Sequence, residues 1–227
     1  SWGKWWAIPA FFLYGTVYAF SNARWHEYGH RSVFKTRKLN DFFYEISSFI
    51  AYFEPVSWRW SHTHHHSRTI HQGIDYEIQV TRPSNLLDLF FIDLFGIKRV
   101  YYEFKKVFLH SLGIMTQVAL DCVPESQRKR MIWSSRVFML IKIIVIVWAF
   151  IIESFLPLMF VVLPQLYGSP ILQLTTMLQH GGLKADTWDH RESTRTVILN
   201  PIHGWLLYFN MQYHTEHHLY PQIPFYN

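Results

Sequence analysis

His214-Thr215-Glu216-His217-His218 carries the pattern H-x-x-H-H, and His62-Thr63-His64-His65-His66 carries it again at its first, fourth and fifth positions. From composition alone, roughly 0.05 copies are expected in this chain, so two copies by chance are on the order of a one-in-a-thousand event. On a helix, positions i, i+3 and i+4 lie on one side, so three imidazoles from one turn can reach a common centre. The two stretches therefore predict two helical turns that meet at a metal site.

A third histidine cluster follows the first apolar block of the chain. In His26-Glu27-Tyr28-Gly29-His30 the two histidines stand at i and i+4 and share a helix face. The same residues read H-E-x-x-H, the zinc-protease pattern with Glu27 as general base, but a protease has no use for the other clusters. Imidazole suits iron, zinc and copper, and the set is too large for one ion. We predict metal ligation by His26, His30, His62, His65, His66, His214, His217 and His218.

Apolar blocks indicate where the chain enters a membrane. Residues 5–20 are nearly continuous in apolar and aromatic character, and the largest block holds two crossings of about 20 residues each, Met131–Ile152 and Phe155–Met177. Pro164 and Gly168 are expected to bend the second of these. Lys and Arg flank the blocks, whereas the turn at 153–154 carries no positive residue. This asymmetry places the flanks on the cytoplasmic side.

Two further apolar stretches, 39–55 and 86–118, contain several charges and are expected to be amphipathic helices in the membrane interface. If the histidine clusters share one site, the chain between any two of them crosses the bilayer an even number of times. A span at 39–55 would break this rule, and a hairpin at 131–177 obeys it. We therefore expect an all-α integral membrane protein whose transmembrane helices carry a cytoplasmic-face cap of histidine-bearing helices. A single domain covers residues 1–227 and is open to extension at both ends.

The histidines outside the three clusters are of two kinds. His180 follows the predicted hairpin, so the even number of crossings returns it to the side of the clusters and makes it a candidate ninth ligand. His64 is out of phase with its neighbours and is expected beside the ligands. Imidazole is often a surface or hydrogen-bonded core group, and this is the role expected of the isolated histidines, His71, His110, His190 and His203.

The composition limits the chemistry. Of 227 residues, 50% are apolar and 16% are charged, with a mean hydropathy of +0.02. The single Cys122 excludes an internal disulfide and any iron–sulfur or zinc site built on cysteines, so metal must be held by nitrogen and oxygen. The net charge of +5 is not gathered on one basic face interleaved with aromatics, so a nucleic-acid partner is not expected.

Other side chains near the clusters suggest supporting roles. Carboxylates are expected to accept the second imidazole N–H and so fix its tautomer; the candidates are Glu27, Glu216, Asp75, Asp189 and Glu54. Aromatic residues beside the second cluster are expected to line an apolar substrate tunnel, with an interfacial aromatic belt as the equal alternative: Tyr52, Phe53, Trp58 and Trp60.

These residues, in this order, resemble the membrane fatty-acid desaturase superfamily, whose histidine boxes read H-x3/4-H, H-x2/3-H-H and H/Q-x2/3-H-H. The resemblance runs from His26 to Pro224 and is most specific at 211–221. It implies that the three clusters are the three boxes and that His180 is the additional histidine before the third. It further implies a non-haem di-iron site at the cytoplasmic membrane face, fed by O2 and electrons. Residues 189–201 resemble a bacterial branch that includes hydrocarbon oxygenases and rhizopine-catabolism oxygenases alongside acyl desaturases.

The expected reaction is O2-dependent desaturation of a fatty-acyl or other lipid-like chain at an unactivated C–H bond. Hydroxylation of the alkane type, or oxidative O-demethylation, is the alternative on the same site. A zinc hydrolase using His26, Glu27 and His30, and a metal-carrying protein, are the interpretations from other classes. No dinucleotide-binding glycine motif supplies electrons, so an external ferredoxin, rubredoxin or cytochrome is expected. The basic segments 98–106 and 128–130 suit an acidic redox protein or, more simply, membrane lipid.

Overall fold

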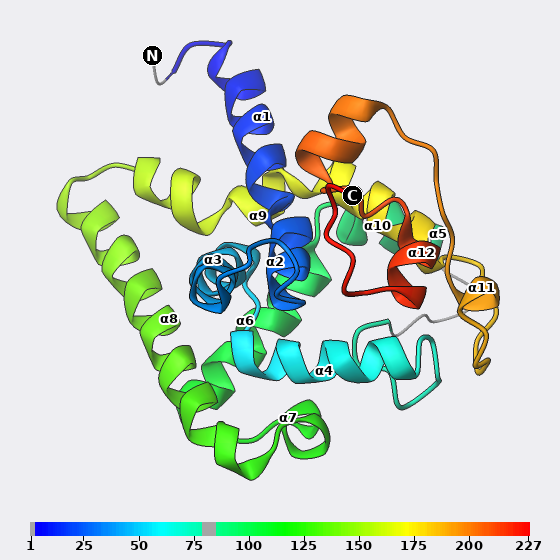
Figure 1. Cartoon of the computed structure of the whole chain (residues 1–227). Coiled ribbons are helices and arrows are strands. Elements are labelled where there is room, and N and C mark those ends of the chain that lie inside the picture. Colours follow the sequence, from blue (N-terminus) through cyan, green and yellow to red (C-terminus); the bar gives the residue numbers. More distant parts are fainter. Residues whose placement is uncertain (1–2, 79–84) are drawn as a thin grey trace.

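The protein is described by a computed structural model that covers residues 3–78 and 85–227 (Figure 1). These residues form helices and connecting turns, and an isolated bridge between Thr196 and Tyr213 is the only β pairing among them. The predicted all-α class is confirmed. In chain order the elements are α1 (Ala7–Ala19), α2 (Ser21–Gly29), α3 (Arg37–Ala51), α4 (Pro55–Ser67), α5 (Leu86–Asp88), η1 (Leu89–Asp93), α6 (Ile97–Ser111), α7 (Gln117–Cys122), α8 (Glu125–Ile151), η2 (Leu158–Val162), α9 (Pro164–Tyr167), α10 (Ser169–His180), α11 (His190–Ser193), η3 (Ile202–Leu207) and α12 (His214–Leu219).

Helix α8 is the one helix of the described residues that is long and apolar enough to cross a membrane. It contains all but the last residue of the crossing predicted at Met131–Ile152 and begins earlier, at Glu125. Its apolar side chains face outward rather than into the molecule, as expected of a helix in contact with lipid. Those exposed along its second half include Leu140, Ile144, Val147, Trp148 and Ile151.

The other two predicted crossings do not form long helices. Helix α1 has 13 residues, fewer than the roughly 20 that span a bilayer without help. Residues 155–177 form η2, α9 and most of α10 instead of one bent helix. The breaks fall at Pro164, whose ring lacks the N–H that a continuing helix needs, and at Gly168. Crossings at 5–20 and Phe155–Met177 therefore stay predictions.

Helix α3 has its polarity reversed relative to a helix of a soluble protein. It buries Asn40, Ser47 and Ser48 and exposes Phe42 and Ile46. In water the apolar stripe of an amphipathic helix faces the protein core. An outward apolar face is the pattern expected of a helix that lies against lipid, as predicted for 39–55. The second predicted interfacial stretch, 86–118, is divided among α5, η1, α6 and the start of α7.

Helix α4 lies across the molecule below α2 and α3, with α8 along one side and α11 and α12 on the other (Figure 1). A buried aromatic cluster of Trp25, Tyr44, Phe53 and Trp58 joins α2, α3 and α4. A second cluster holds α1 and α10 to the C-terminal segment through Phe20, Leu172, Tyr208 and Met211. The packing thus fixes α2, α4, α10 and the segment just before α12, which together carry the predicted ligands.

Helix α1 crosses the junction of α9 and α10 at Gly15 and Gly168, where the two backbones touch. A Cβ added to Gly168 would lie 1.9 Å from the carbonyl carbon of Gly15, and one added to Gly15 would lie 2.3 Å from the Tyr167 ring. Only glycine fits at this crossing. The contact sets the position of α10 and hence of His180 at its end.

We expect Gly168→Ala to lower the stability of the fold by about 3 kcal/mol or more. Overpacking a tight contact costs about 1–3 kcal/mol when side chains can shift, and here the obstacle is backbone. Thermal unfolding in detergent measures the loss. Ala10→Val adds bulk on an exposed part of α1 and should change stability by less than about 0.5 kcal/mol. Equal unfolding temperatures for Gly168→Ala and the unsubstituted protein would contradict this packing.

Candidate metal centre

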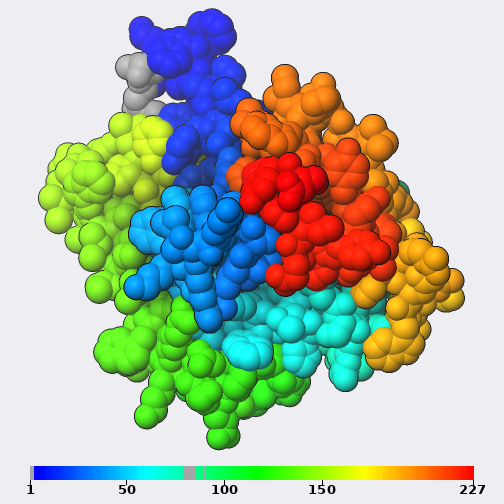
Figure 2. Space-filling model, viewed as in Figure 1, coloured from blue at the N-terminus to red at the C-terminus, as the bar shows by residue number. Residues whose placement is uncertain are grey.

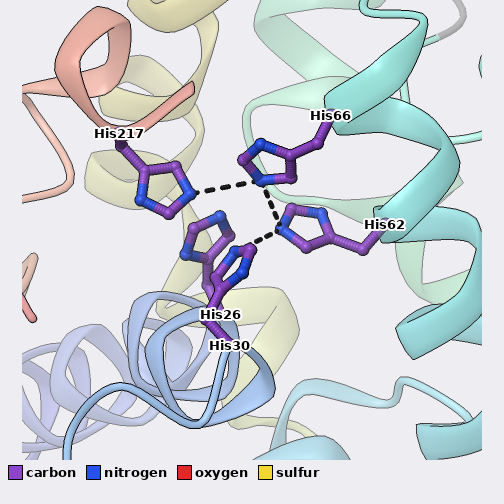
Figure 3. A group of neighbouring side chains, drawn as sticks. All are labelled: His26, His30, His62, His66 and His217. Atoms are coloured by element: carbon purple, nitrogen blue, oxygen red, sulfur yellow. Dashed lines mark hydrogen bonds between the residues drawn. The ribbon is translucent and has the colours of Figure 1, made fainter. Parts of the chain in front are cut away.

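Five histidines from three helices converge on one point, as Figure 3 shows. Each offers one ring nitrogen, and these five nitrogens lie within 4.8 Å of one another. The closest pairs join Nε2 atoms: His30 to His62 at 3.0 Å, His62 to His66 at 3.1 Å and His66 to His217 at 3.2 Å. This five-histidine group consists of His26 of α2 and His30 directly after it, His62 and His66 of α4, and His217 of α12.

A second set, the four-histidine group, lies beside the first. It consists of His65 of α4, His180 at the end of α10, and His214 and His218 of α12, all buried. The Nε2 atom of His214 lies 2.8 Å from that of His180 and 3.2 Å from that of His218. The structure therefore brings together all nine histidines that the sequence singled out as ligands.

The three histidines of one H-x-x-H-H turn do not share a centre, contrary to the sequence-based expectation. In α4, His62 and His66 join the five-histidine group, whereas His65 joins the four-histidine group. In α12, His217 joins the five-histidine group, whereas His214 and His218 join the four-histidine group. The reason is helical geometry. Positions i and i+4 are about 40° apart around the axis, whereas i+3 and i+4 are about 100° apart, which lets one turn serve two centres.

Hydrogen bonds on the far side of the rings fix which nitrogen carries the proton. His62 Nδ1 donates to Glu77 Oε2 (2.7 Å), His65 Nδ1 to Asp75 Oδ2 (2.8 Å) and His180 Nδ1 to Ser193 O (2.9 Å). Thr69 Oγ1 donates to His65 O, so it accepts from His218 Nδ1 at 3.2 Å. With the proton on Nδ1, each of these rings turns the lone pair of Nε2 inward.

Lone pairs that face one another repel unless a cation lies between them. The Nε2 contacts within each group are about 3 Å, too short for facing lone pairs to converge without compensation. His26 Nε2 is buried and makes no hydrogen bond. An orphaned imidazole nitrogen in a ring of inward-facing nitrogens is what a metal ion satisfies, so the donor set fits two ions bound by imidazole.

The electrostatics favour the neutral form of seven of these imidazoles, which is the form that binds metal. Burial, and then the neighbouring imidazoles, hold the pKa values of His26, His30, His66, His214 and His218 well below the usual value. The same causes lower the pKa of His217 to about 3 and that of His180 to about 4. The pKa of His65 is instead raised: burial opposes its charge, but Glu77 and Asp75 outweigh that effect.

The predicted carboxylates divide into two sets. Asp75 holds His65, and Glu27 Oε1 lies 3.2 Å from His26 Nδ1 and 4.0 Å from His217 Nδ1. The structure places the other three elsewhere: Glu54 caps α4 at the Val56 and Ser57 amides, Asp189 pairs with Arg191, and Glu216 accepts from Thr196 Oγ1. Burial raises the pKa of Glu27 to about 8.

Several supporting groups were missed from the sequence. Glu77, Thr69 and the Ser193 carbonyl all bind ligand rings. The sequence offered one signal for Glu77: it stands two residues after Asp75, the carboxylate that was predicted to bind a ligand ring. Among the isolated histidines, His190 lies next to the site, with its ring centroid 5.2 Å from that of His218. His110 is buried away from it and bonds Thr116.

The aromatic residues expected to line a tunnel are core residues instead. Phe53 and Trp58 belong to the buried aromatic cluster, where Trp58 Nε1 donates to Glu103. Trp60 packs on a third apolar cluster, formed by Val56, Ala119, Val123 and Met131, and the Tyr52 hydroxyl donates to Val162 O. The large cavity, about 520 Å³, lies on another side, between η3 and the C-terminal segment. Its lining includes Glu27, His217, Phe209, Met211, Tyr220 and Phe225.

The C-terminal segment that lines this cavity lies at the front of the molecule in Figure 2, against the N-terminal quarter of the chain. Tyr226 donates its hydroxyl to Val33 O, and Asn210 Nδ2 donates to Phe225 O.

The model of the family described as fatty acid desaturase matches residues 3–227. The chain belongs to the fatty acid desaturase family. A comparison with curated proteins found no match, and a comparison with solved structures found none.

Membership of the desaturase family makes the chain an oxidoreductase and, together with the apolar helix α8, a membrane protein. The two histidine groups are the parts of this family member that can hold metal. His26 and His30 of the zinc-protease pattern both lie in the five-histidine group. They therefore belong to a larger set of ligands than that pattern describes.

We expect His180→Ala to remove at least one metal ion, because it takes one of four nitrogens from the four-histidine group. Metal content after purification measures this. His110→Ala is the matched control: it removes a similarly buried imidazole that belongs to neither group and should leave metal content unchanged. Full metal occupancy in the His180 variant would show that this residue is structural.

Proposed function

We propose that this desaturase-family chain is an O2-dependent di-iron oxidoreductase that introduces a double bond into a fatty-acyl or other lipid-like chain. The observation that carries the proposal is the convergence of inward-facing Nε2 atoms in two adjacent groups, of five and of four histidines. One ion per group makes two irons, the number that the family resemblance implies.

The reaction balances as follows. Two hydrogen atoms leave neighbouring carbons of the substrate, O2 accepts these together with two electrons and two protons from outside, and two water molecules form with the new C=C bond. Two iron ions bound by the histidines would supply the activation of O2 and the removal of hydrogen from an unactivated C–H bond. If oxygen returned to the carbon instead, the product would be an alcohol, or formaldehyde from a methoxy group.

The chain's own groups support this chemistry by holding the ligands. Asp75 and Glu77 fix the tautomers of His65 and His62, and their negative charges offset part of the charge of two cations. Asp75 is itself held by the Ile70 and Glu77 amides. A ligand whose second nitrogen is anchored in this way keeps its orientation when the metal changes its charge.

We assign the substrate to the 520 Å³ cavity, because it is the described cavity that reaches both His217 and Glu27. Its size lies within the range of small-molecule sites, and aromatic and apolar side chains make up most of its wall. Neighbouring η3 exposes Ile202, Trp205 and Leu206, an apolar surface suited to the membrane interface. A lipid-like substrate would therefore enter from the interface.

The electron supply and the membrane orientation belong to the same proposal. A separate ferredoxin, rubredoxin or cytochrome delivers the electrons, and the histidine groups face the cytoplasm. Arg128, Lys129 and Arg130 support this orientation, because they lie at the start of α8, before its apolar half.

The test of the proposed function is product analysis by mass spectrometry after incubation with lipid extract, O2 and a reductase–ferredoxin pair. We expect a product two mass units lighter than its substrate and none when NADH or NADPH replaces the electron-donor pair. A product sixteen mass units heavier would identify a hydroxylase, and hydrolysis without O2 would contradict the proposal.

We expect Ile223→Trp to lower kcat/KM by about tenfold or more, since an indole in the cavity wall removes space that the substrate needs, and tenfold corresponds to about 1.4 kcal/mol. Iron content should not change. Ile198→Trp makes the same exchange at an exposed residue outside the cavity lining and should retain activity. Unchanged kcat/KM in the Ile223 variant would assign the substrate elsewhere.

A further inference from the structure

A second, smaller cavity touches the five-histidine group. It has a volume of about 40 Å³ and is lined by parts of α2, α3 and α4, including His26, His30 and His62. One water molecule needs about 10–15 Å³ on this measure, so the cavity has room for a ligand of one to three atoms. It is too small for the lipid-like substrate assigned to the larger cavity.

Two of the lining residues, Trp25 and Arg59, carry buried hydrogen-bond donors without a partner. These are the indole Nε1 of Trp25 and the guanidinium Nη2 of Arg59. Burial raises the pKa of the Tyr44 hydroxyl, and the charge of Arg59 together with polar contacts from Trp25 and Arg59 to its oxygen lowers that pKa in part. The hydroxyl donates to Pro55 O at 2.7 Å, and these polar contacts lack the geometry of full hydrogen bonds, so both donors keep bonding capacity for a better-placed acceptor. Buried donors are nearly always satisfied in proteins, so two at one small cavity point to an acceptor bound there.

The charge around Arg59 favours an anion. Three arginines form ion pairs with the carboxylate of Asp41: Arg31 at 2.8 Å, Arg59 at 3.0 Å and Arg37 at 3.8 Å. One carboxylate cannot neutralise three guanidinium groups, so Arg59, the one of the three that lines the cavity, keeps part of its positive charge uncompensated. This charge reaches the histidines, since Arg59 contributes to the lowered pKa of His30, after burial and the neighbouring His62 and His217.

We propose that this small cavity is a binding site for an anionic or oxygen-centred hydrogen-bond acceptor of one to three atoms, held by Arg59 Nη2 and Trp25 Nε1 beside the five-histidine group. The site itself follows from the cavity, the donors and the charge, whereas its use in catalysis rests on the proposed function. Oxygen that accepts electrons gains negative charge, and fixed donors beside it stabilise that charge. Arg59 and Trp25 would then be positioning residues for the oxygen side of the reaction.

The probe is azide, a triatomic anion that fits the size limit. The readout is the ¹H–¹⁵N signal of the Trp25 indole, identified by its loss in Trp25→Phe and recorded in metal-free and zinc-loaded protein during an azide titration. We expect a saturable shift of this signal. Arg59→Met should weaken the apparent Kd about tenfold or more, because it removes a charged donor. Arg59→Lys, which keeps the charge without the guanidinium fork, should weaken it by a smaller factor.

Arg37→Met is the matched control, since Arg37 shares Asp41 but its side chain is 74% exposed and does not line the cavity. It should leave the Kd unchanged. The proposal is overturned if azide does not shift the Trp25 signal in either form, or if folded Arg59→Met and Arg59→Lys both bind azide as tightly as the unsubstituted protein. Iron content and product formation are measured separately. Oxidised product without an effect of Arg59 on azide binding would reject this site alone, and the reverse result would reject the proposed function alone.

Discussion

Nine imidazoles whose ring nitrogens converge in two adjacent groups are the constraint on which the rest of the structure depends. Ring nitrogens that face one another at about 3 Å repel without a cation, and several of the rings are held on their far side. The loop after α4 supplies Asp75 and Glu77, α10 is followed by the Ser193 carbonyl, and Thr69 holds His218. The four helices therefore meet where these outer hydrogen bonds orient the rings toward two common centres.

The distribution of side chains on the surface indicates contact with lipid instead of water. Helix α8 directs its apolar side chains outward, and α3 buries Asn40 and Ser48 while it exposes Phe42. A buried Lys142 in α8 makes no hydrogen bond and lies instead over the rings of Tyr52 and Phe49. Polar groups that cannot face lipid turn to the interior.

The two cavities approach the five-histidine group through different residues and differ in chemistry. The larger one is mainly aromatic and apolar and reaches His217 and Glu27, whereas the smaller one carries the guanidinium of Arg59 and touches His30 and His62. The proposed reaction brings a lipid-like chain and O2 to the same place. Two cavities of different polarity would keep the lipid-like chain apart from the small, oxygen-centred acceptor proposed for the smaller one.

The sequence by itself determined which histidines form the site, because i, i+3 and i+4 spacing is a local property of a helix. It also determined the helical class and the crossing at α8, since apolar length is local too. Only the tertiary structure decided that His65 and His217 each leave their box neighbours for the other group. It alone moved Trp58 from a tunnel wall to the core and revealed Glu77 as a partner of His62. These features depend on how distant helices pack, and spacing along the chain does not encode the angle between two axes.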